Sequence, residues 1–218
     1  MIEAKEKEET GEQLPKIIRP MKPVKVETLP KNESDWMLEI KWDGARAIVY
    51  TNRNLQQFQI QSSSGRDISQ QFPEFGNGLE ILAREHSTIL DSEIVSAGEK
   101  IGGERGTGSK VLGRLSSNPP NDLEIRRRKC QLFIFDLLYL DGQNLCTQPL
   151  VERKRLLAKL LTKHFQNKHG IVITPYWNKN HKRATKEARK QGFEGVVLKR
   201  KNSTYYQGQS KSWLKIKF

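Results

Sequence analysis

The sequence is poor in cysteine and has no long apolar run. Its two cysteines, Cys130 and Cys146, fit no metal-binding spacing. No stretch of about 18 apolar residues exists, so no segment has the pattern of a membrane-spanning helix. The first nine residues are charged and lack the apolar stretch of a signal peptide. These absences predict a reduced cytoplasmic protein with no membrane partner.

The sequence also lacks the pattern G-x-x-x-x-G-K-[S/T], which excludes a Walker-type phosphate loop. Acidic residues are in deficit, with 25 Asp and Glu against 38 Lys and Arg, and the net charge is +13. Residues 1–20 carry −1, so the remaining chain carries +14. A body this basic predicts a polyanionic partner, most often nucleic acid. The alternative is a surface charge that only keeps the protein soluble.

The hydrophobic pattern predicts a charged, disordered tail over residues 1–19 and one domain over residues 20–218. Expected strands outnumber expected helices and do not alternate with them, which favours an α+β fold with antiparallel sheets. Residues 36–42 alternate, with Trp36, Leu38, Ile40 and Trp42 on one face. Gly44 then allows a reversal into residues 45–50, which predicts a hairpin.

Other expected strands cover residues 89–95, 132–138, 195–199 and 213–217. Helices are expected over residues 152–165 and 180–191, with a weaker one over 72–84. Residues 97–121 are rich in Gly, Ser, Asn and Pro and predict a loop with one short helix over 109–115.

Lys41 is the candidate nucleophile, because it lies in an otherwise apolar strand and is followed by Asp43 and Gly44. A lysine has a reference pKa of ~10.4, and bringing it to ~7 takes roughly 4–5 kcal/mol. Burial and neighbouring cations supply such a shift. A surface lysine at a strand end is the alternative for this motif taken alone.

The other candidate groups follow in order along the chain. Glu93 and Glu194 are acids in or beside apolar strands, where they could hold Mg²⁺ or form ordinary salt bridges. Phe135 could stack on a purine or belong to the core. Lys215 and Lys217 share one face of a strand, which suits a triphosphate or a solvated surface.

Five motifs in this order resemble those of the covalent nucleotidyltransferases, specifically ATP-dependent DNA ligases and most closely the ligase module of bacterial non-homologous end-joining enzymes. The motifs are Lys41-x-Asp43-Gly44-x-Arg46, Asp91-x-Glu93, Phe135-Asp136, residues 194–199 (EGVVLK) and residues 213–217 (WLKIK). The resemblance covers residues ~20–218. It implies an ATP-grasp-like adenylation domain that acts in DNA repair and recombination.

The resemblance also implies a role for each matched residue. Lys41 would attack the α-phosphate of ATP and carry AMP, which would pass to a 5′-phosphate at a nick before the 3′-OH displaces it. Lys215 and Lys217 would hold the α-phosphate. The implied metal ligands, for Mg²⁺ or Mn²⁺, are Glu93 and Glu194. The implied nucleotide contacts are Glu39, Ile40, Arg46, Glu93, Phe135 and Lys199. The implied partners are double-stranded DNA with a nick or ends, Ku, and a polymerase or primase module, in a bacterial cytoplasm near the nucleoid.

Two departures from the family pattern qualify this expectation. Ser63 stands where an arginine is expected, and Arg66 is the candidate phosphate contact in its place. The sequence ends at Phe218, before the OB-fold domain that such ligases carry, so that domain is expected in cis in a longer protein or in trans. Without it we expect slow or absent self-adenylation from ATP and poor DNA affinity.

Two alternatives stay open at this point. One is an RNA ligase or capping-type nucleotidyltransferase on the same fold. The other is a catalytically weak DNA-binding module. In either case the basic residues of 180–191 are a candidate face for tracking phosphates, or a solvated helix surface.

Overall fold

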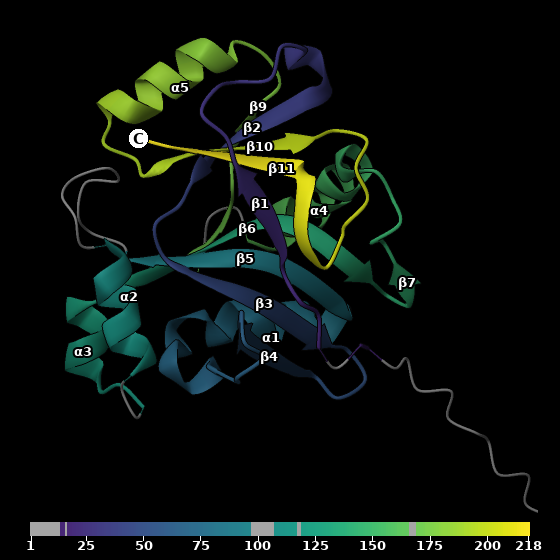
Figure 1. Cartoon of the computed structure of the whole chain (residues 1–218). Helices are drawn as coiled ribbons and strands as arrows, with labels where there is room; N and C mark the ends of the chain where they lie inside the picture. Colours follow the sequence, from purple (N-terminus) through teal and green to yellow (C-terminus); the bar gives the residue numbers. More distant parts are fainter. Residues whose placement is uncertain (1–13, 16, 97–106, 117–118, 166–168) are drawn as a thin grey trace, which may run out of the picture.

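The chain is described from a computed structural model, which covers residues 14–15, 17–96, 107–116, 119–165 and 169–218. These residues form two β-sheets with helices packed against them (Figure 1), so the predicted α+β class is confirmed. No helix in the described ranges is long and apolar enough to cross a membrane. The expected tail falls mostly outside these ranges, although Ile18 is buried and its amide donates to Tyr50 Oη.

The first sheet, near the top of Figure 1, has five strands in the order β1-β11-β10-β2-β9. The β1–β11 pair is parallel, and the other pairs are antiparallel. Its strands are β1 (Met21–Lys25), β2 (Trp36–Lys41), β9 (Tyr176–Trp177), β10 (Gly195–Arg200) and β11 (Gly208–Lys217). This sheet therefore joins segments from both ends of the described chain.

The second sheet has the order β4-β3-β5-β6-β7, and β8 pairs with β6 in parallel. Its other pairs are antiparallel. Its strands are β3 (Ala45–Asn52), β4 (Gln57–Ser62), β5 (Thr88–Ser96), β6 (Cys130–Leu140), β7 (Gln143–Asn144) and β8 (Ile171–Ile173). The long central pair, β5 and β6, carries two of the predicted motifs.

Helices α1 and α4 contact the second sheet and α5 contacts the first. The helices are α1 (Gly76–Glu85), α2 (Thr107–Leu115), α3 (Asp122–Arg127), α4 (Leu150–His164) and α5 (His181–Lys190), with 3₁₀ turns at Glu33–Asp35, Ser69–Gln71 and Pro73–Phe75. Each of α1, α4 and α5 turns its apolar stripe inward, as helical periodicity predicts.

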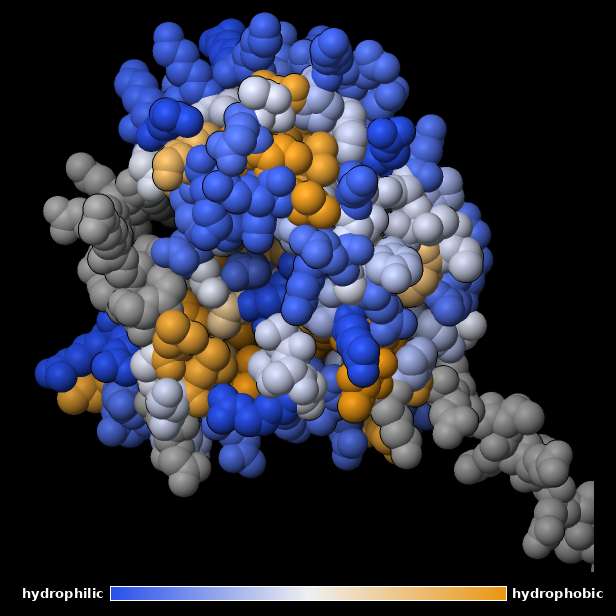
Figure 2. Space-filling view, viewed as in Figure 1, coloured by the Kyte–Doolittle hydropathy of each residue, from blue (hydrophilic) through white to orange (hydrophobic). Residues whose placement is uncertain are grey.

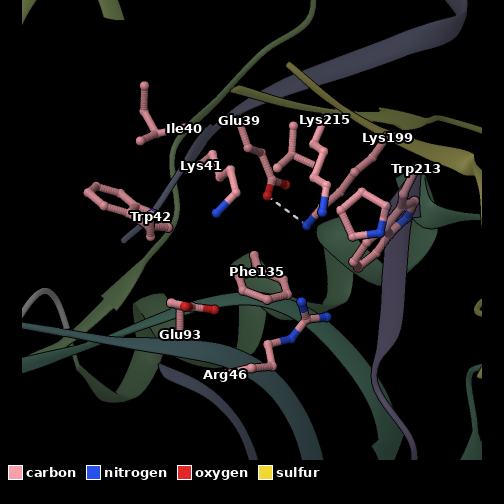
Figure 3. Close-up of a pocket in the computed structure, with 12 residues that line it drawn as sticks. Glu39, Ile40, Lys41, Trp42, Arg46, Glu93, Phe135, Lys199, Trp213 and Lys215 are labelled. Carbon is pink, nitrogen blue, oxygen red and sulfur yellow. Dashed lines mark ion pairs between the residues drawn. The ribbon is translucent and has the colours of Figure 1, made fainter. Parts of the chain in front are cut away.

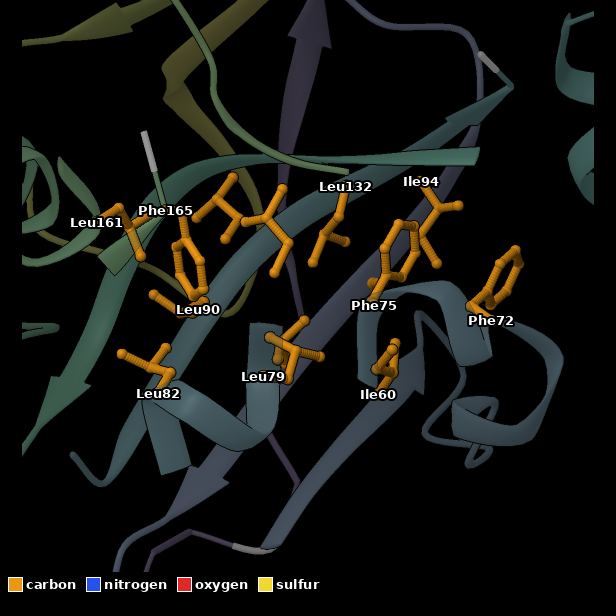
Figure 4. Packing of buried hydrophobic residues seen from close by; sticks show 14 of the residues in the cluster. Ile60, Phe72, Phe75, Leu79, Leu82, Leu90, Ile94, Leu132, Leu161 and Phe165 are labelled. Carbon is orange, nitrogen blue, oxygen red and sulfur yellow. The ribbon is translucent and has the colours of Figure 1, made fainter. Parts of the chain in front are cut away.

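Three buried clusters hold these layers together. The largest packs α1 and α4 onto the second sheet, with Leu82, Leu90 and Leu161 among its members (Figure 4). A second cluster packs α5 onto the first sheet. The third joins the two sheets face to face, since it combines Trp213 of β11 with Tyr50 of β3 and neighbouring residues. Polar side chains that project from either sheet beside this third cluster are therefore enclosed from both sides.

The predicted hairpin between residues 36–42 and 45–50 is wrong. β2 pairs with β10 and β9 in the first sheet, whereas β3 pairs with β4 and β5 in the second. The chain crosses between the sheets at Gly44, where an added Cβ would lie 2.0 Å from the carbonyl oxygen of Ile94. The glycine therefore permits a close backbone approach to β5 in place of a two-strand turn.

The remaining differences concern short elements. The expected helix over 72–84 begins only at Gly76, after a 3₁₀ turn, and α3 was not predicted. A capping box between Asn121 and Glu124 is the sequence signal that could have found α3. Strands β1, β4, β7, β8 and β9 were also missed. Much of the expected loop, residues 97–106 and 117–118, lies outside the described residues.

Two glycines make a test of this packing. In Gly195→Ala the new Cβ would lie 2.1 Å from the Ile216 carbonyl oxygen, so we expect a loss of about 1–3 kcal/mol in unfolding free energy. In Gly76→Ala the new Cβ would lie 3.8 Å from Phe58 Cζ and the backbone is helical, so we expect no loss or a gain of up to ~1 kcal/mol. Urea unfolding of both variants measures this. Equal effects would contradict the described pairing of β10 with β11.

Candidate active site

A pocket with a cavity volume of about 160 Å³ opens between the two sheets. The face that contains it is largely hydrophilic and is hollowed between the sheets (Figure 2). The first sheet contributes Glu39, Lys41, Lys199 and Lys215, and the second contributes Arg46, Glu93 and Phe135. These side chains converge on one space (Figure 3). Most of the residues predicted from the motifs therefore meet here.

Lys41 is the last residue of β2, and its side chain is 21% exposed. Its Nζ donates a hydrogen bond to Glu194, whose other oxygen lies 2.7 Å from Lys217 Nζ. Strand register explains this contact, because Gly195 pairs with both Lys41 and Lys217, which places Glu194 between them. Partial burial opposes ionisation, but the hydrogen bonds from Lys217 and Lys41 hold the pKa of Glu194 below its ordinary value.

Glu93 and Arg46 face each other in the register of β5 and β3. Arg46 binds Asp91 through two hydrogen bonds of 2.5 and 2.6 Å. Burial alone would lower the pKa of Arg46, but Asp91 reverses this and raises it above its ordinary value. Burial raises the pKa of Glu93 to about 7, even though Arg46 and Lys41 oppose the rise. The neighbouring cations therefore balance the negative charge of ionised Glu93 only in part. A bound cation would balance the rest.

A buried set of three charges lies at another wall of the pocket. Glu39 Oε1 is 2.5 Å from Lys154 Nζ and Glu39 Oε2 is 2.6 Å from Lys199 Nζ, and all three side chains are at most 2% exposed. Burial lowers the pKa of Lys199 to about 8, although Glu39 acts in the opposite direction. Two ammonium groups against one carboxylate leave this wall with excess positive charge.

Phe135 forms an aromatic part of the pocket wall, and it is 6% exposed. Lys199 Nζ lies 4.0 Å from the centroid of its ring, and Arg46 Cζ lies 4.6 Å from the same centroid. The next residue, Asp136, does not line the pocket and forms a buried ion pair with Arg153 of α4. The pairing of β6 with β5 shifts register at this motif, so side chains do not alternate regularly there.

The structure separates some predicted residues from the pocket centre. Ile40 lines the pocket but is buried in the cluster under α5, and Lys217 is half exposed at its pairing with Glu194. Arg66 does not line the pocket; its guanidinium donates to the carbonyl of Leu115. Arg66 therefore shows no contact here that replaces the arginine missing at Ser63.

Sequence reasoning missed Lys154, because on α4 it looks like one of several basic residues on a solvated helix face. Tertiary contacts bring it to Glu39, because α4 packs on β6 and the amides of Leu150 and Val151 at its start donate to carbonyls just after β10. Trp213 was noted as part of a motif but not as a pocket wall, although it lines the pocket with its ring centroid 4.1 Å from Lys199 Nζ. The expected basic face of α5 is present and exposed. Its residues are Lys182, Arg183, Lys186, Arg189 and Lys190.

The comparisons with known proteins agree with one another. A family model described as ATP dependent DNA ligase domain matches residues 15–217. The multifunctional non-homologous end joining protein LigD of Mycolicibacterium smegmatis is 31% identical over 183 residues, covering 84% of this chain and 21% of that protein. A DNA ligase of Thermococcus fumicolans is 29% identical over 180 residues, covering 82% of this chain and 32% of that protein. The chain thus spans between a fifth and a third of the length of these relatives.

Solved structures give the same result. A structure described as mycobacterial DNA ligase D complexed with ATP and MES superposes with a TM-score of 0.73 at 28% identity, covering 92% of this chain and 60% of that one. The Chlorella virus DNA ligase-adenylate, with a TM-score of 0.60 and 16% identity over 93% of this chain and 69% of that one, shares the fold. Because the family model spans nearly the whole sequence, the chain belongs to the family of ATP-dependent DNA ligase domains.

Proposed function

We propose that this chain carries out nucleotidyl transfer for DNA ligation through Lys41. In the first step Lys41 Nζ forms a bond to the α-phosphorus of ATP, and the bond to the β-phosphate oxygen breaks with release of pyrophosphate. In the second, a 5′-phosphate oxygen at a nick displaces Lys41 from that phosphorus. In the third, the 3′-OH attacks the activated 5′-phosphate and AMP leaves.

The observation that carries this proposal is the position of Lys41 Nζ, which projects into the pocket among two carboxylates and several cations (Figure 3). A nucleophilic amine needs its lone pair, so the proton that Nζ shares with Glu194 has to leave before attack. Arg46 and Lys215 line the same pocket and would stabilise the charge that develops on the transferring phosphoryl group.

The base of ATP is proposed to stack on Phe135, with Glu39 and Lys199 at its edge. Lys199 Nζ and Arg46 Cζ lie 4.0 and 4.6 Å from the centroid of this ring, and Trp213 lines the same pocket. Flat aromatic walls favour a planar base. An ionised carboxylate only accepts hydrogen bonds, so Glu39 suits a purine that presents an amino group there. Adenine and guanine both carry an amino group, so the choice between ATP and GTP, the substrate of the capping-type alternative, is left to the adduct test.

Glu93 and Glu194 are the proposed ligands for Mg²⁺ or Mn²⁺. The donor set fits, because both groups offer carboxylate oxygens and the charge of Glu194 contributes to the raised pKa of Glu93. The metal would supply positive charge against the triphosphate. Glu194 is paired with Lys41 and Lys217, so a metal there would have to share this carboxylate with them.

The proposed substrate is double-stranded DNA with a nick or ends, in bacterial cytoplasm near the nucleoid. The net charge of +13 and the exposed basic face of α5 support a phosphate backbone as the partner. The similarity to a protein named for non-homologous end joining supports repair of broken ends, with Ku, a polymerase or primase module and an OB-fold domain as candidate partners.

Lys41→Ala tests the covalent step. We expect the 218-residue chain to gain an AMP adduct, seen as an increase in intact mass after incubation with ATP and Mg²⁺, and we expect Lys41→Ala to show none. Lys211→Ala is the matched control, because Lys211 is an exposed lysine on β11. An adduct that persists in Lys41→Ala would reject the proposed nucleophile. Adduct from GTP but not ATP would favour the capping-type alternative.

The pKa of Glu93 predicts how stability changes with pH. Since this pKa is raised from 4.5 to about 7 in the folded state, the folded protein holds this proton more tightly than the unfolded chain. The resulting stabilisation is fully present below pH ~4.5 and is lost as the pH rises to ~7. In metal-free buffer we therefore expect wild type to lose ~1–3 kcal/mol relative to Glu93→Gln between pH 5 and 7.5. Urea unfolding across this range measures the difference; a constant difference would contradict the burial of Glu93.

Lys154→Met tests whether the buried ion pairs of Glu39 contribute to nucleotide binding. Removing one of the two lysines that hold Glu39 should destabilise the fold by about 1–3 kcal/mol and weaken ATP binding about tenfold. Lys154→Arg should recover part of both losses, because it keeps the charge. Lys159→Met changes an exposed lysine of the same helix and should leave both unchanged. Calorimetric ATP titration and urea unfolding give the two readouts. If Lys154→Met and Lys159→Met had equal ATP affinity and equal stability, Lys154 would have no role in the nucleotide-binding site.

A further inference from the structure

A second group of metal-binding side chains lies where α1 and α4 end. Glu85 is the last residue of α1, His86 follows it, and His164 is the last residue of α4. Each offers one ligand atom, and these three atoms lie within 4.8 Å of one another. The two imidazole rings are 5.5 Å apart between centroids. None of the three residues lines the pocket between the sheets.

His86 is held by a carboxylate on the side away from a potential ligand. Its Nδ1 lies 2.6 Å from Asp141 Oδ2. Asp141 is itself fixed, because its Oδ1 accepts from the Ser87 amide at 2.9 Å and its own amide donates to the Ser87 carbonyl at 2.8 Å. A carboxylate on one imidazole nitrogen orients the ring and leaves Nε2 for a metal, which is the usual support of a metal-bound histidine.

Glu85 divides its two oxygens between different neighbours. Oε2 accepts from Lys163 Nζ at 2.9 Å, whereas Oε1 faces His164 Nδ1 at 3.9 Å. The second distance is too long for a hydrogen bond. Glu85 Oε1 is therefore not held by His164 Nδ1.

His164 is the observation that points to a ligand. Its side chain is 2% exposed, and its Nε2 is buried with no hydrogen-bond partner among the described residues. A buried imidazole with an unsatisfied nitrogen is costly. A metal ion bound at Nε2 would supply the partner that this buried nitrogen lacks.

We propose that Glu85, His86 and His164 bind one divalent transition-metal ion, with Zn²⁺ as the first candidate. Two imidazole nitrogens and one carboxylate oxygen, with a water at the fourth position, form a common donor set for this ion. The ion would connect the end of α1 to the end of α4 and, through Asp141, to the turn between β6 and β7. It is a structural link in the second sheet and takes no part in nucleotidyl transfer.

The chain itself offers matched variants for a binding test. We would titrate the reduced 218-residue protein with Zn²⁺ against a chromogenic chelator, and record the visible spectrum with Co²⁺ to identify the donor atoms. We expect one ion per chain, a Co²⁺ spectrum of nitrogen and oxygen donors without thiolate bands, and a rise in unfolding temperature with Zn²⁺. His86→Ala with His164→Ala should abolish all three signals.

Two further variants keep the result interpretable if that double variant folds poorly. Asp141→Asn alters no ligand and should weaken Zn²⁺ binding about 10–100-fold. Glu85→Gln changes an exposed side chain and should weaken it while leaving the metal-free fold intact. His169→Asn is the control, because it removes an exposed histidine at a positive φ of 58° that asparagine tolerates, and it should bind as wild type.

Three outcomes would overturn the proposal. The first is the absence of saturable binding. The second is binding that both Glu85→Gln and Asp141→Asn leave unchanged, which would place an adventitious ion elsewhere. The third is a Co²⁺ spectrum with thiolate bands, which would assign the metal to Cys130 or Cys146.

Discussion

The contact between the two sheets is the constraint on which the site depends, and a three-residue crossover, Trp42 to Gly44, sets it. β2 ends at Lys41 in the first sheet and β3 begins at Ala45 in the second, so Lys41 and Arg46 enter one pocket from opposite sides. Trp42 stacks on Phe133 of β6 at 3.8 Å between ring centroids. Because side chains alternate along a strand, a shift of one residue at this crossover would turn Lys41 or Arg46 away from the pocket.

The charges in the pocket are compensated within small groups, as burial requires. Glu39 has two lysines, Arg46 has Asp91, and Glu194 has two lysines, but each group is built from segments far apart in the sequence. Among the lining residues, four cations face two carboxylates, and Glu93 retains a raised pKa. The pocket as a whole therefore has an excess of positive charge, which a bound polyphosphate would balance.

Sequence reasoning predicts the parts of this arrangement that depend on local pattern. The apolar face of residues 36–42 is confirmed, because Trp36, Leu38, Ile40 and Trp42 share one buried cluster. The partner of that strand was beyond local pattern, since β2 pairs with β10 over 150 residues away. The same limit explains the missed role of Lys154. It also explains why Lys41, expected among cations that would lower its pKa, has the carboxylate of Glu194 as its nearest partner.

Burial divides the cations of the site into two groups with different freedom. Lys154 and Lys199 are at most 2% exposed, and each is fixed by Glu39 and by an aromatic ring. Lys41 and Lys217 are 21% and 49% exposed and share the single carboxylate of Glu194. A partly exposed lysine can exchange partners at low cost, because water stabilises it while it moves, whereas a buried one cannot. The buried pair therefore fixes the shape of the aromatic end, and the exposed pair can rearrange around an incoming phosphate. Lysine occurs in both groups, so surroundings rather than residue type decide which cations are fixed and which can exchange partners.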